Sequence, residues 1–536
     1  MIGRVVICAL FALPLLARAS ATDLDLSPAQ LESKVRRVTL AGGLTLAELQ
    51  HKTSDGVVSG AIVLPFGDLD GRPAARQTAI LVSRSLSLGA GDLSNKEITD
   101  KLAALHMSVY PAGDRLELRF LGVPRGDLPA VLDLAATLLR HPAFPEREVD
   151  KVRLAWVNEM WRDRANPEKV AQAAIDGFDD LPAPTRHKDR WGDAIDAISG
   201  ISVEDVRAFH RDFYGAAALK VALVGDFDAP QAEARLAALF GDWKAGVPYS
   251  HSVKPFAPKP AKRTITDTPG AGSAAYRASI AFPLEDNSPD YPLLLLATRI
   301  LGDLGADSRL DQSLNGAIGE RRASLAIDRR DGSAALVVTV GFASQFREKV
   351  ALEVPAALAA LRQDGVTQYQ LDEAREGLLT ARNASRGSDA ELAAIMANQL
   401  LAGAGFEREV RIVDAVKSAT VEDVDKAIQT YFAPEHMVEV FAGNFSGSPA
   451  GSTTKFSGPL ETLFSLLPLV LVCIAAGICV AAGLVYRRQR RWGNAASPAA
   501  APGQEYQARR AQLSQTIAGL KEEAKDLERW SRAIEK

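Results

Sequence analysis

Cysteine is scarce in this sequence, with three residues among 536. Cys8 lies near the N-terminus, and Cys473 and Cys479 lie in an apolar run near the C-terminus. The long stretch between them has none, so disulfides, cysteine metal ligands and thiolate nucleophiles are excluded from most of the chain.

Paired histidines are also missing. The zinc motifs of metallopeptidases place two histidines three or four residues apart, because side chains at that spacing share one helix face. No two of the seven histidines have this spacing; they are His51, His106, His141, His187, His210, His251 and His436. Gly-x-Ser-x-Gly, phosphate-binding and dinucleotide-binding glycine patterns are absent too. The sequence therefore contains no local motif for a zinc, serine-hydrolase or nucleotide site.

The chain has no excess of positive charge. Its 62 Lys and Arg residues are interspersed with 66 Asp and Glu residues, which gives a formal net charge of −4. Proteins that bind nucleic acid neutralise phosphates with a basic patch or stripe, and none stands out here. Nucleic acid is therefore excluded as a main partner.

Two apolar runs mark the ends of the chain. Arg4 followed by the short run Val5–Leu16 and by small residues predicts a signal peptide over residues 1–21. Residues Phe464 to Tyr486 carry no formal charge and are numerous enough to cross about 30 Å of hydrocarbon as a helix. Arginines follow this segment directly, so we expect a cytoplasmic C-terminus and a periplasmic or extracellular ectodomain on a single-pass membrane protein.

The last part of the chain has a distinct composition. A basic and Pro/Ala-rich linker is expected over residues 487–504. In residues 505–536 apolar side chains such as Leu513, Ile517 and Leu520 recur at steps of three and four, which predicts a coiled coil that could join copies or partners. A single solvated helix is the alternative interpretation.

The ectodomain contains an internal repeat. Gly200–Val206 matches Ser418–Val424, and Gly225–Phe227 matches Gly443–Phe445 at the same offset. In each copy a Ser or Thr cap and acidic residues begin a helix, and an apolar strand ending in Gly follows. Further helices are expected over 128–139 and 354–361, and strands over 60–64 and 334–341.

The repeat predicts a tandem duplicated α+β fold. The expected organisation is an N-terminal domain at 22–246, a hinge linker at 247–262, a C-terminal domain at 263–448 and a linker at 449–463, followed by the membrane helix at 464–486.

Three further segments carry a resemblance through their order and spacing along the chain: Leu64–Arg72, Leu86–Ser94 and Gly365–Ala374. Together with the repeats they resemble the insulinase and pitrilysin family of metallopeptidases, which includes mitochondrial processing peptidases and the core proteins of the respiratory cytochrome complex. The resemblance implies two insulinase-type halves that form a clam-like ectodomain.

Active members of that family carry His-x-x-Glu-His on a helix of the first domain and a distal Glu as third zinc ligand. The resemblance places these motif positions at Ile80, Ser83 and Arg84 and the distal carboxylate at Glu159. Ile80 has no lone pair, Ser83 is no base at neutral pH, and Arg84 puts a permanent cation where a metal would sit. Glu159 alone cannot hold zinc, so its ordinary interpretation is a solvated residue on a helix surface.

The family also uses an Arg and a Tyr from its second half to orient the substrate. The aligned positions here hold Asn315 and Arg322. Both parts of the catalytic apparatus are thus degenerate, and we expect neither a metal nor another cofactor.

The sequence favours a catalytically inactive, membrane-anchored homologue of the insulinase family, a pseudo-peptidase that binds a protein or peptide. Its partner could be a zinc-bearing subunit of the same family, or the protein could serve as a scaffold. Two alternatives remain: an active zinc endopeptidase with an unrecognised site, and a membrane sensor that couples the ectodomain to the cytoplasmic coiled coil.

Overall fold

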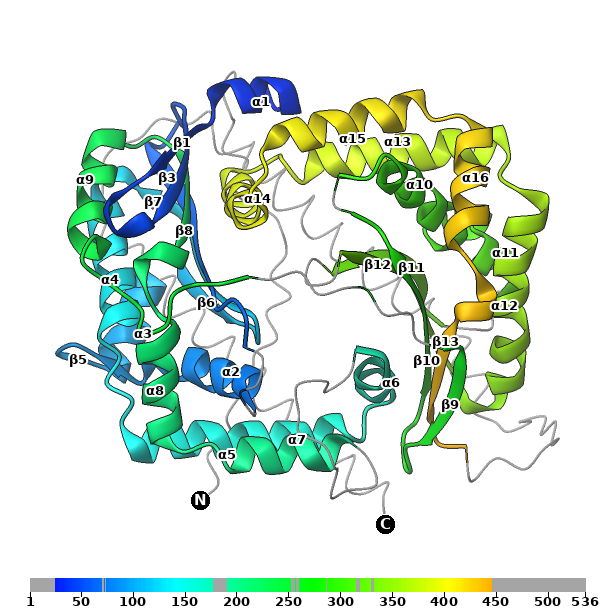
Figure 1. Cartoon of the computed structure of the whole chain (residues 1–536), viewed down its shortest axis with the longest axis horizontal. Coiled ribbons are helices and arrows are strands. Elements are labelled where there is room, and N and C mark those ends of the chain that lie inside the picture. The colour runs from blue at the N-terminus through cyan, green and yellow to red at the C-terminus, as the bar shows by residue number, and fades with distance from the viewer. Residues whose placement is uncertain are drawn as a thin grey trace, which may run out of the picture. The chain divides into compact units, whose positions relative to one another are not determined.

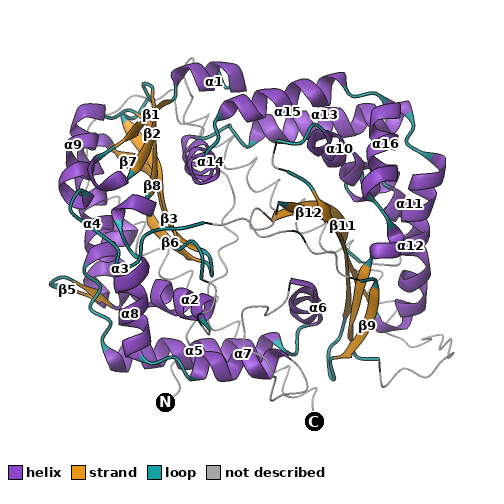
Figure 2. Ribbon diagram, viewed as in Figure 1, coloured by secondary structure: helices purple, strands orange, loops and turns teal. Residues whose placement is uncertain are grey.

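The computed structural model describes residues 25–445, with gaps at 70–71, 73, 177–189, 252–255, 257–259, 286, 315–318 and 329–331. The predicted signal peptide, membrane segment, terminal linkers and coiled coil lie outside the described residues. Within the described ranges no helix combines the length and hydrophobicity needed to cross a membrane. Both halves of the chain contain helices and strands (Figure 2), which confirms a mixed α+β fold.

The first sheet has six strands in the order β1-β2-β8-β3-β7-β6. Their bounds are β1 (Arg36–Thr39), β2 (Thr45–Gln50), β3 (Val57–Pro65), β6 (Met107–Pro111), β7 (Arg115–Pro124) and β8 (Lys220–Gly225). A short separate ribbon consists of β4 (Gly89–Ala90) and β5 (Leu93–Ser94).

The second sheet has five strands in the order β11-β12-β10-β13-β9. They are β9 (Lys262–Asp267), β10 (Ala274–Pro283), β11 (Arg321–Asp328), β12 (Ser333–Phe342) and β13 (Val438–Gly443). Read from its other end, this order repeats the run β2-β8-β3-β7-β6 of the first sheet. The directions agree as well: β2 with β8 and β9 with β13 are the parallel pairs, and the other neighbours in each run are antiparallel. Among the described strands of the two large sheets, only β1 has no counterpart.

The helices of the first half of the chain are α1 (Pro28–Lys34), α2 (Ala75–Ser85), α3 (Asn95–Ala104), α4 (Leu128–Arg140), α5 (Glu146–Asp163), α6 (Pro167–Asp176), α7 (Arg190–Ser199), α8 (Val203–Phe213) and α9 (Ala229–Phe240). Those of the second half are α10 (Asp290–Gly302), α11 (Arg309–Leu314), α12 (Arg347–Asp364), α13 (Gln368–Ala384), α14 (Asp389–Ala402), α15 (Phe406–Ser418) and α16 (Val421–Tyr431).

The repeated sequences form α8 with β8 and α16 with β13. At the start of α8 the Asp205 N–H donates to the Ser202 hydroxyl at 3.1 Å, and the Asp205 carboxylate accepts from the Ser202 N–H at 2.8 Å. Thr420 and Asp423 make the same reciprocal bonds at the start of α16. Each of these reciprocal arrangements is a capping box, which satisfies two backbone donors that the first helical turn would leave unpaired. The same local chemistry therefore begins both helices.

Each sheet is covered on one face by a helix from the other half of the chain. Leu392, Ala393, Met396 and Ala397 of α14 pack with side chains of β2, β3 and β8, among them Leu49, Ala61, Val63, Ala222 and Val224. Reciprocally, Val170 and Ala171 of α6 pack with Ala275, Val440 and Ala442 of the second sheet. Figure 1 shows α14 beside the first sheet and α6 beside the second. The other face of each sheet carries its own large core.

A buried ion pair fixes the beginning of α14 to the first sheet. His51 follows β2, and its Nε2 lies 2.8 Å from Oδ1 of Asp389, the first residue of α14. The His51 side chain is only 9% exposed. The hydrogen bond to Asp389 raises the pKa of His51, although burial opposes this shift. Protonated His51 therefore pairs best with α14.

We expect the Asp389→Asn variant to lose more thermal stability at pH 5.5 than at pH 8.5. A histidine with a raised pKa stabilises the fold fully below its unfolded pKa of about 6.5, and this contribution disappears as the pH rises through the raised value. Melting temperatures of the native protein and of the Asp389→Asn variant, measured at both of these pH values, check this expectation. In a His51→Gln background the Asp389→Asn change should have the same effect at every pH, and a pH-independent effect in the native background would contradict the assignment.

Candidate functional site

Helix α2 carries the three degenerate motif positions. Ile80 packs against the core of the first half. Ser83 is buried, and its hydroxyl donates to the Ala79 carbonyl at 2.9 Å. A serine hydroxyl is no base at neutral pH, so Ser83 cannot deprotonate a water as the Glu of the zinc motif does.

Arg84, also on α2, forms an ion pair with Glu159 of α5. One guanidinium nitrogen donates to Glu159 Oε2 at 2.8 Å, and the other lies 3.5 Å from Oε1. The Arg84 guanidinium also lies over the ring of Trp156, 5.0 Å from its centroid. The structure thus brings together two positions 75 residues apart in sequence. The Glu159 side chain is 43% exposed, as expected of a residue on a helix surface, and its carboxylate is in addition engaged by Arg84.

The hydrogen bond from Arg84 lowers the pKa of the Glu159 carboxyl, and partial burial opposes this shift. Glu159 is therefore ionised at neutral pH and already neutralised by a fixed cation. A metal at this place would have to displace the guanidinium, which cannot lose its proton in a protein. Among the described residues no group of three His, Cys, Asp or Glu side chains is arranged to hold a metal ion.

One of the two substrate-orienting positions is described. Asn315 lies outside the described residues. Arg322 is on β11, where it is in register with Thr339 of β12. No described contact links Arg322 to Arg84 or Glu159.

Sequence reasoning missed Trp156, the buried ring that supports Arg84. It stands three residues before Glu159, nearly one helical turn away, and this spacing puts both on neighbouring parts of one helix face. The tryptophan three positions before Glu159 was the sequence feature that could have predicted an arginine packed over an aromatic ring beside this carboxylate.

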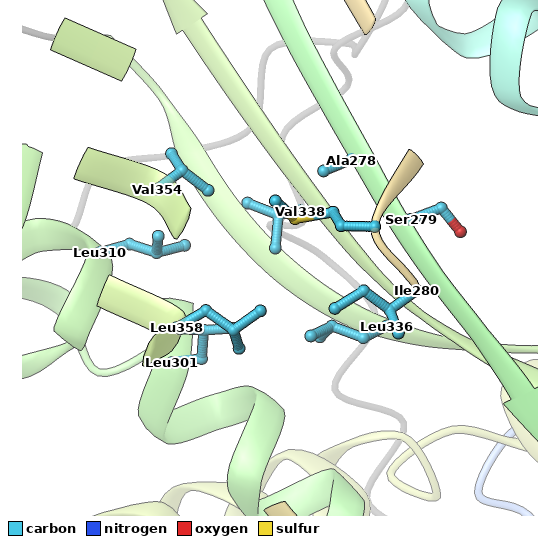
Figure 3. A pocket seen from close by; sticks show the side chains of 10 residues that line it. Ala278, Ser279, Ile280, Leu301, Leu310, Leu336, Val338, Val354 and Leu358 are labelled. Atoms are coloured by element: carbon cyan, nitrogen blue, oxygen red, sulfur yellow. The ribbon is translucent and has the colours of Figure 1, made fainter. Parts of the chain in front are cut away.

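Two cavities lie away from these residues. The one in Figure 3 is a void of about 10 Å³ in the core of the second half, lined by apolar side chains that include Ile280, Leu336 and Leu358. It has room for about one water and few polar groups to hold it, so it is a packing gap. A larger cavity of about 220 Å³ in the first half is lined by Phe66, Phe213, Trp243 and neighbours. Neither cavity is lined by both halves, and neither includes Arg84 or Glu159.

We expect the Arg84→Met variant, which retains an apolar stem over Trp156, to lose about 1 kcal/mol or less of stability at pH 7. A carboxyl with a lowered pKa stabilises the fold above its unfolded pKa of about 4.5, and this contribution disappears as the pH falls through the lowered value. The difference from the native protein should therefore shrink at pH 3.5. Arg147→Met, at an exposed position near the start of α5, is the matched control; equal losses for Arg84→Met at both pH values would contradict the pairing.

Part of the chain, beyond the Arg84–Glu159 pair, matches a known protein family. Residues 200–378 match the family described as peptidase M16 inactive domain, a segment that runs from the first half of the chain into the second. A search of curated proteins gives no match.

Several solved structures share the fold. A peptidase M16 inactive domain from Pseudomonas fluorescens has a TM-score of 0.67 at 19% identity, covering 78% of this chain and 99% of its own. A protease from Helicobacter pylori has a TM-score of 0.64 at 16% identity, covering 76% and 99%. The periplasmic protease PqqL from Escherichia coli has a TM-score of 0.61 at 15% identity; 78% of this chain matches 49% of PqqL.

The family match and the shared fold agree with the order of motifs read from the sequence. They confirm the predicted resemblance: residues 200–378 match the peptidase M16 inactive domain family, most of the chain shares the fold of solved M16-type structures, and the sequence lacks the paired-histidine zinc motif.

Proposed function

We propose that this protein is a non-catalytic M16-type subunit that binds another protein or a peptide. The observation that carries the proposal is the Arg84–Glu159 ion pair, which occupies the positions where the family resemblance expects two zinc ligands. A guanidinium supplies no lone pair to a metal and cannot generate a bound hydroxide. The fold is kept while the hydrolytic centre is replaced by a neutral pair.

Retention of the whole fold supports a binding role. Both sheets, both cores and the reciprocal helices are intact, and a protein of similar fold engages another protein: a mutant of the ferredoxin protease FusC has been solved in complex with Arabidopsis ferredoxin. This chain shares 16% identity with FusC at a TM-score of 0.55, and 76% of it matches 47% of FusC. A fold can keep a binding surface after its chemistry has gone.

The proposal includes attachment to a membrane. The uncharged segment 464–486 and the arginines after it would hold the protein as a single-pass anchor, with the ectodomain periplasmic or extracellular. A partner would then be met at the membrane surface, either a zinc-bearing M16 subunit or a component of a membrane complex that this protein supports. The tail 505–536 would contribute to assembly on the cytoplasmic side.

The direct test restores the motif in the full-length chain with Ile80→His, Ser83→Glu and Arg84→His. Residues 80 and 84 stand one helical turn apart, and removing Arg84 releases the Glu159 carboxylate, so three ligands become available. We expect close to one zinc per chain by mass spectrometry after dialysis against micromolar zinc, and essentially none in the native protein. Adding Glu159→Gln to the triple variant is the matched control and should weaken zinc binding markedly.

Two results would count against the proposal. Stoichiometric zinc and chelator-sensitive peptide cleavage in the native protein would establish a working peptidase with an unrecognised site. A folded triple variant that binds no zinc would show that the aligned positions do not converge on a metal site. Purification of the full-length protein from its native membrane, followed by mass spectrometry, should then show a stoichiometric protein partner if the binding role is right.

A further inference from the structure

The outer edge of β9 is a second feature at which another chain could bind. β9 ends the second sheet and pairs in parallel with β13, and none of the described strands pairs with its other side (Figure 2). In the first sheet the equivalent strand, β2, is covered at that edge by β1, which pairs with it antiparallel. An edge strand offers a row of backbone donors and acceptors to any strand that can match it.

The backbone bonds at both ends of β9 show which residues offer these groups. The N–H of Lys262 donates to the Met437 carbonyl at 3.3 Å, and the N–H of Thr268 donates to the Gly443 carbonyl at 2.8 Å. Backbone groups alternate sides along a strand. Even-numbered residues therefore face β13, whereas Arg263, Ile265 and Asp267 direct their N–H and C=O groups to the outer edge.

The side chains of these outward-bonding residues have a suitable character. Ile265 is 53% exposed, so a large β-branched side chain is available at this edge. Arg263 is held by Glu439 through two hydrogen bonds of 2.8 and 3.0 Å, and Asp267 accepts from the Phe445 N–H at 2.9 Å. The two charged side chains are thus fixed in position on either side of an exposed isoleucine.

We propose that β9 pairs antiparallel with β9 of a second copy of this chain, across a two-fold axis at Ile265. This register places Ile265 opposite the partner's Ile265 and Arg263 opposite the partner's Asp267. All three residues are those whose backbone groups point outward, so each opposed pair can exchange hydrogen bonds. Thr264 and Thr266, both β-branched, meet on the other face of the sheet.

Neighbouring registers fit less well. A two-fold axis at Thr264 would place Arg263 opposite Ile265 and leave Asp267 opposite Ala261, so the complementary charges would separate. A shift of one residue in the pairing would oppose side chains on different faces of the sheet. The sequence Lys262–Asp267 is therefore self-complementary in one register, which is the property a symmetric interface requires. The inference is independent of whether the protein binds zinc or a peptide.

The experiment places a single cysteine at the proposed axis. In full-length protein with the three native cysteines changed to alanine, Ile265→Cys should form a disulfide-linked dimer on mild oxidation, because Cα atoms of a hydrogen-bonded pair lie about 5.5 Å apart. Leu154→Cys on α5, which is 56% exposed, is the matched control and should not cross-link. Failure of Ile265→Cys to cross-link above the control would overturn the proposal.

A second variant tests the contact without cross-linking. Ile265→Lys opposes two ammonium groups at the axis, so light scattering of the full-length protein in detergent should show the dimeric mass of the native protein fall to the monomeric mass. Leu154→Lys should leave the dimer intact. Because one strand pair buries less than a standard interface, the native dimer should also dissociate on dilution. A monomeric native protein, or a dimer that survives Ile265→Lys and is therefore held by the tail, would each refute pairing through β9.

Discussion

Burial of both faces of each sheet is the constraint on which the described structure depends. Strands such as β3 and β8 are buried along nearly their whole length, so each needs apolar cover on two sides. The helices of each half cover one face, and α14 or α6 from the other half covers the second. Alanines on α14 and on the facing strands allow the helix to lie close, which adds dispersion contacts but leaves little tolerance for larger side chains. Neither sheet is complete without the other half.

This exchange explains why the fold can outlast its chemistry. Among the groups that hold the halves together are the apolar cluster around Met396, the smaller one around Val170, and the His51–Asp389 pair. None of them includes Arg84 or Glu159. A change of charge between α2 and α5 therefore leaves the cover of both sheets untouched, and an arginine can replace a metal ligand without loss of the architecture.

The Arg84–Glu159 pair is also a modest contributor to stability. Both side chains are partly exposed, and exposed pairs of this kind contribute little net free energy. The pair instead determines which cation lies at Glu159, because a guanidinium that cannot be deprotonated is already paired with the carboxylate. The proposed dimer edge lies elsewhere, on a strand whose charges are fixed by Glu439 and Phe445, so binding through β9 and the lost metal site are separate properties of one fold.

The sequence by itself determined the local structure and the chemistry that is missing. The caps at Ser202 and Thr420, the strand at 60–64 within β3 and the absence of paired histidines all follow from residue order, because capping, alternation and motif spacing act over a few residues. Only the tertiary structure decided that α14 crosses to the first sheet, that Glu159 meets Arg84 and that β9 lies at an edge. Apolar periodicity tells which face of an element is buried, but not which distant element covers it, since that depends on packing between residues hundreds of positions apart.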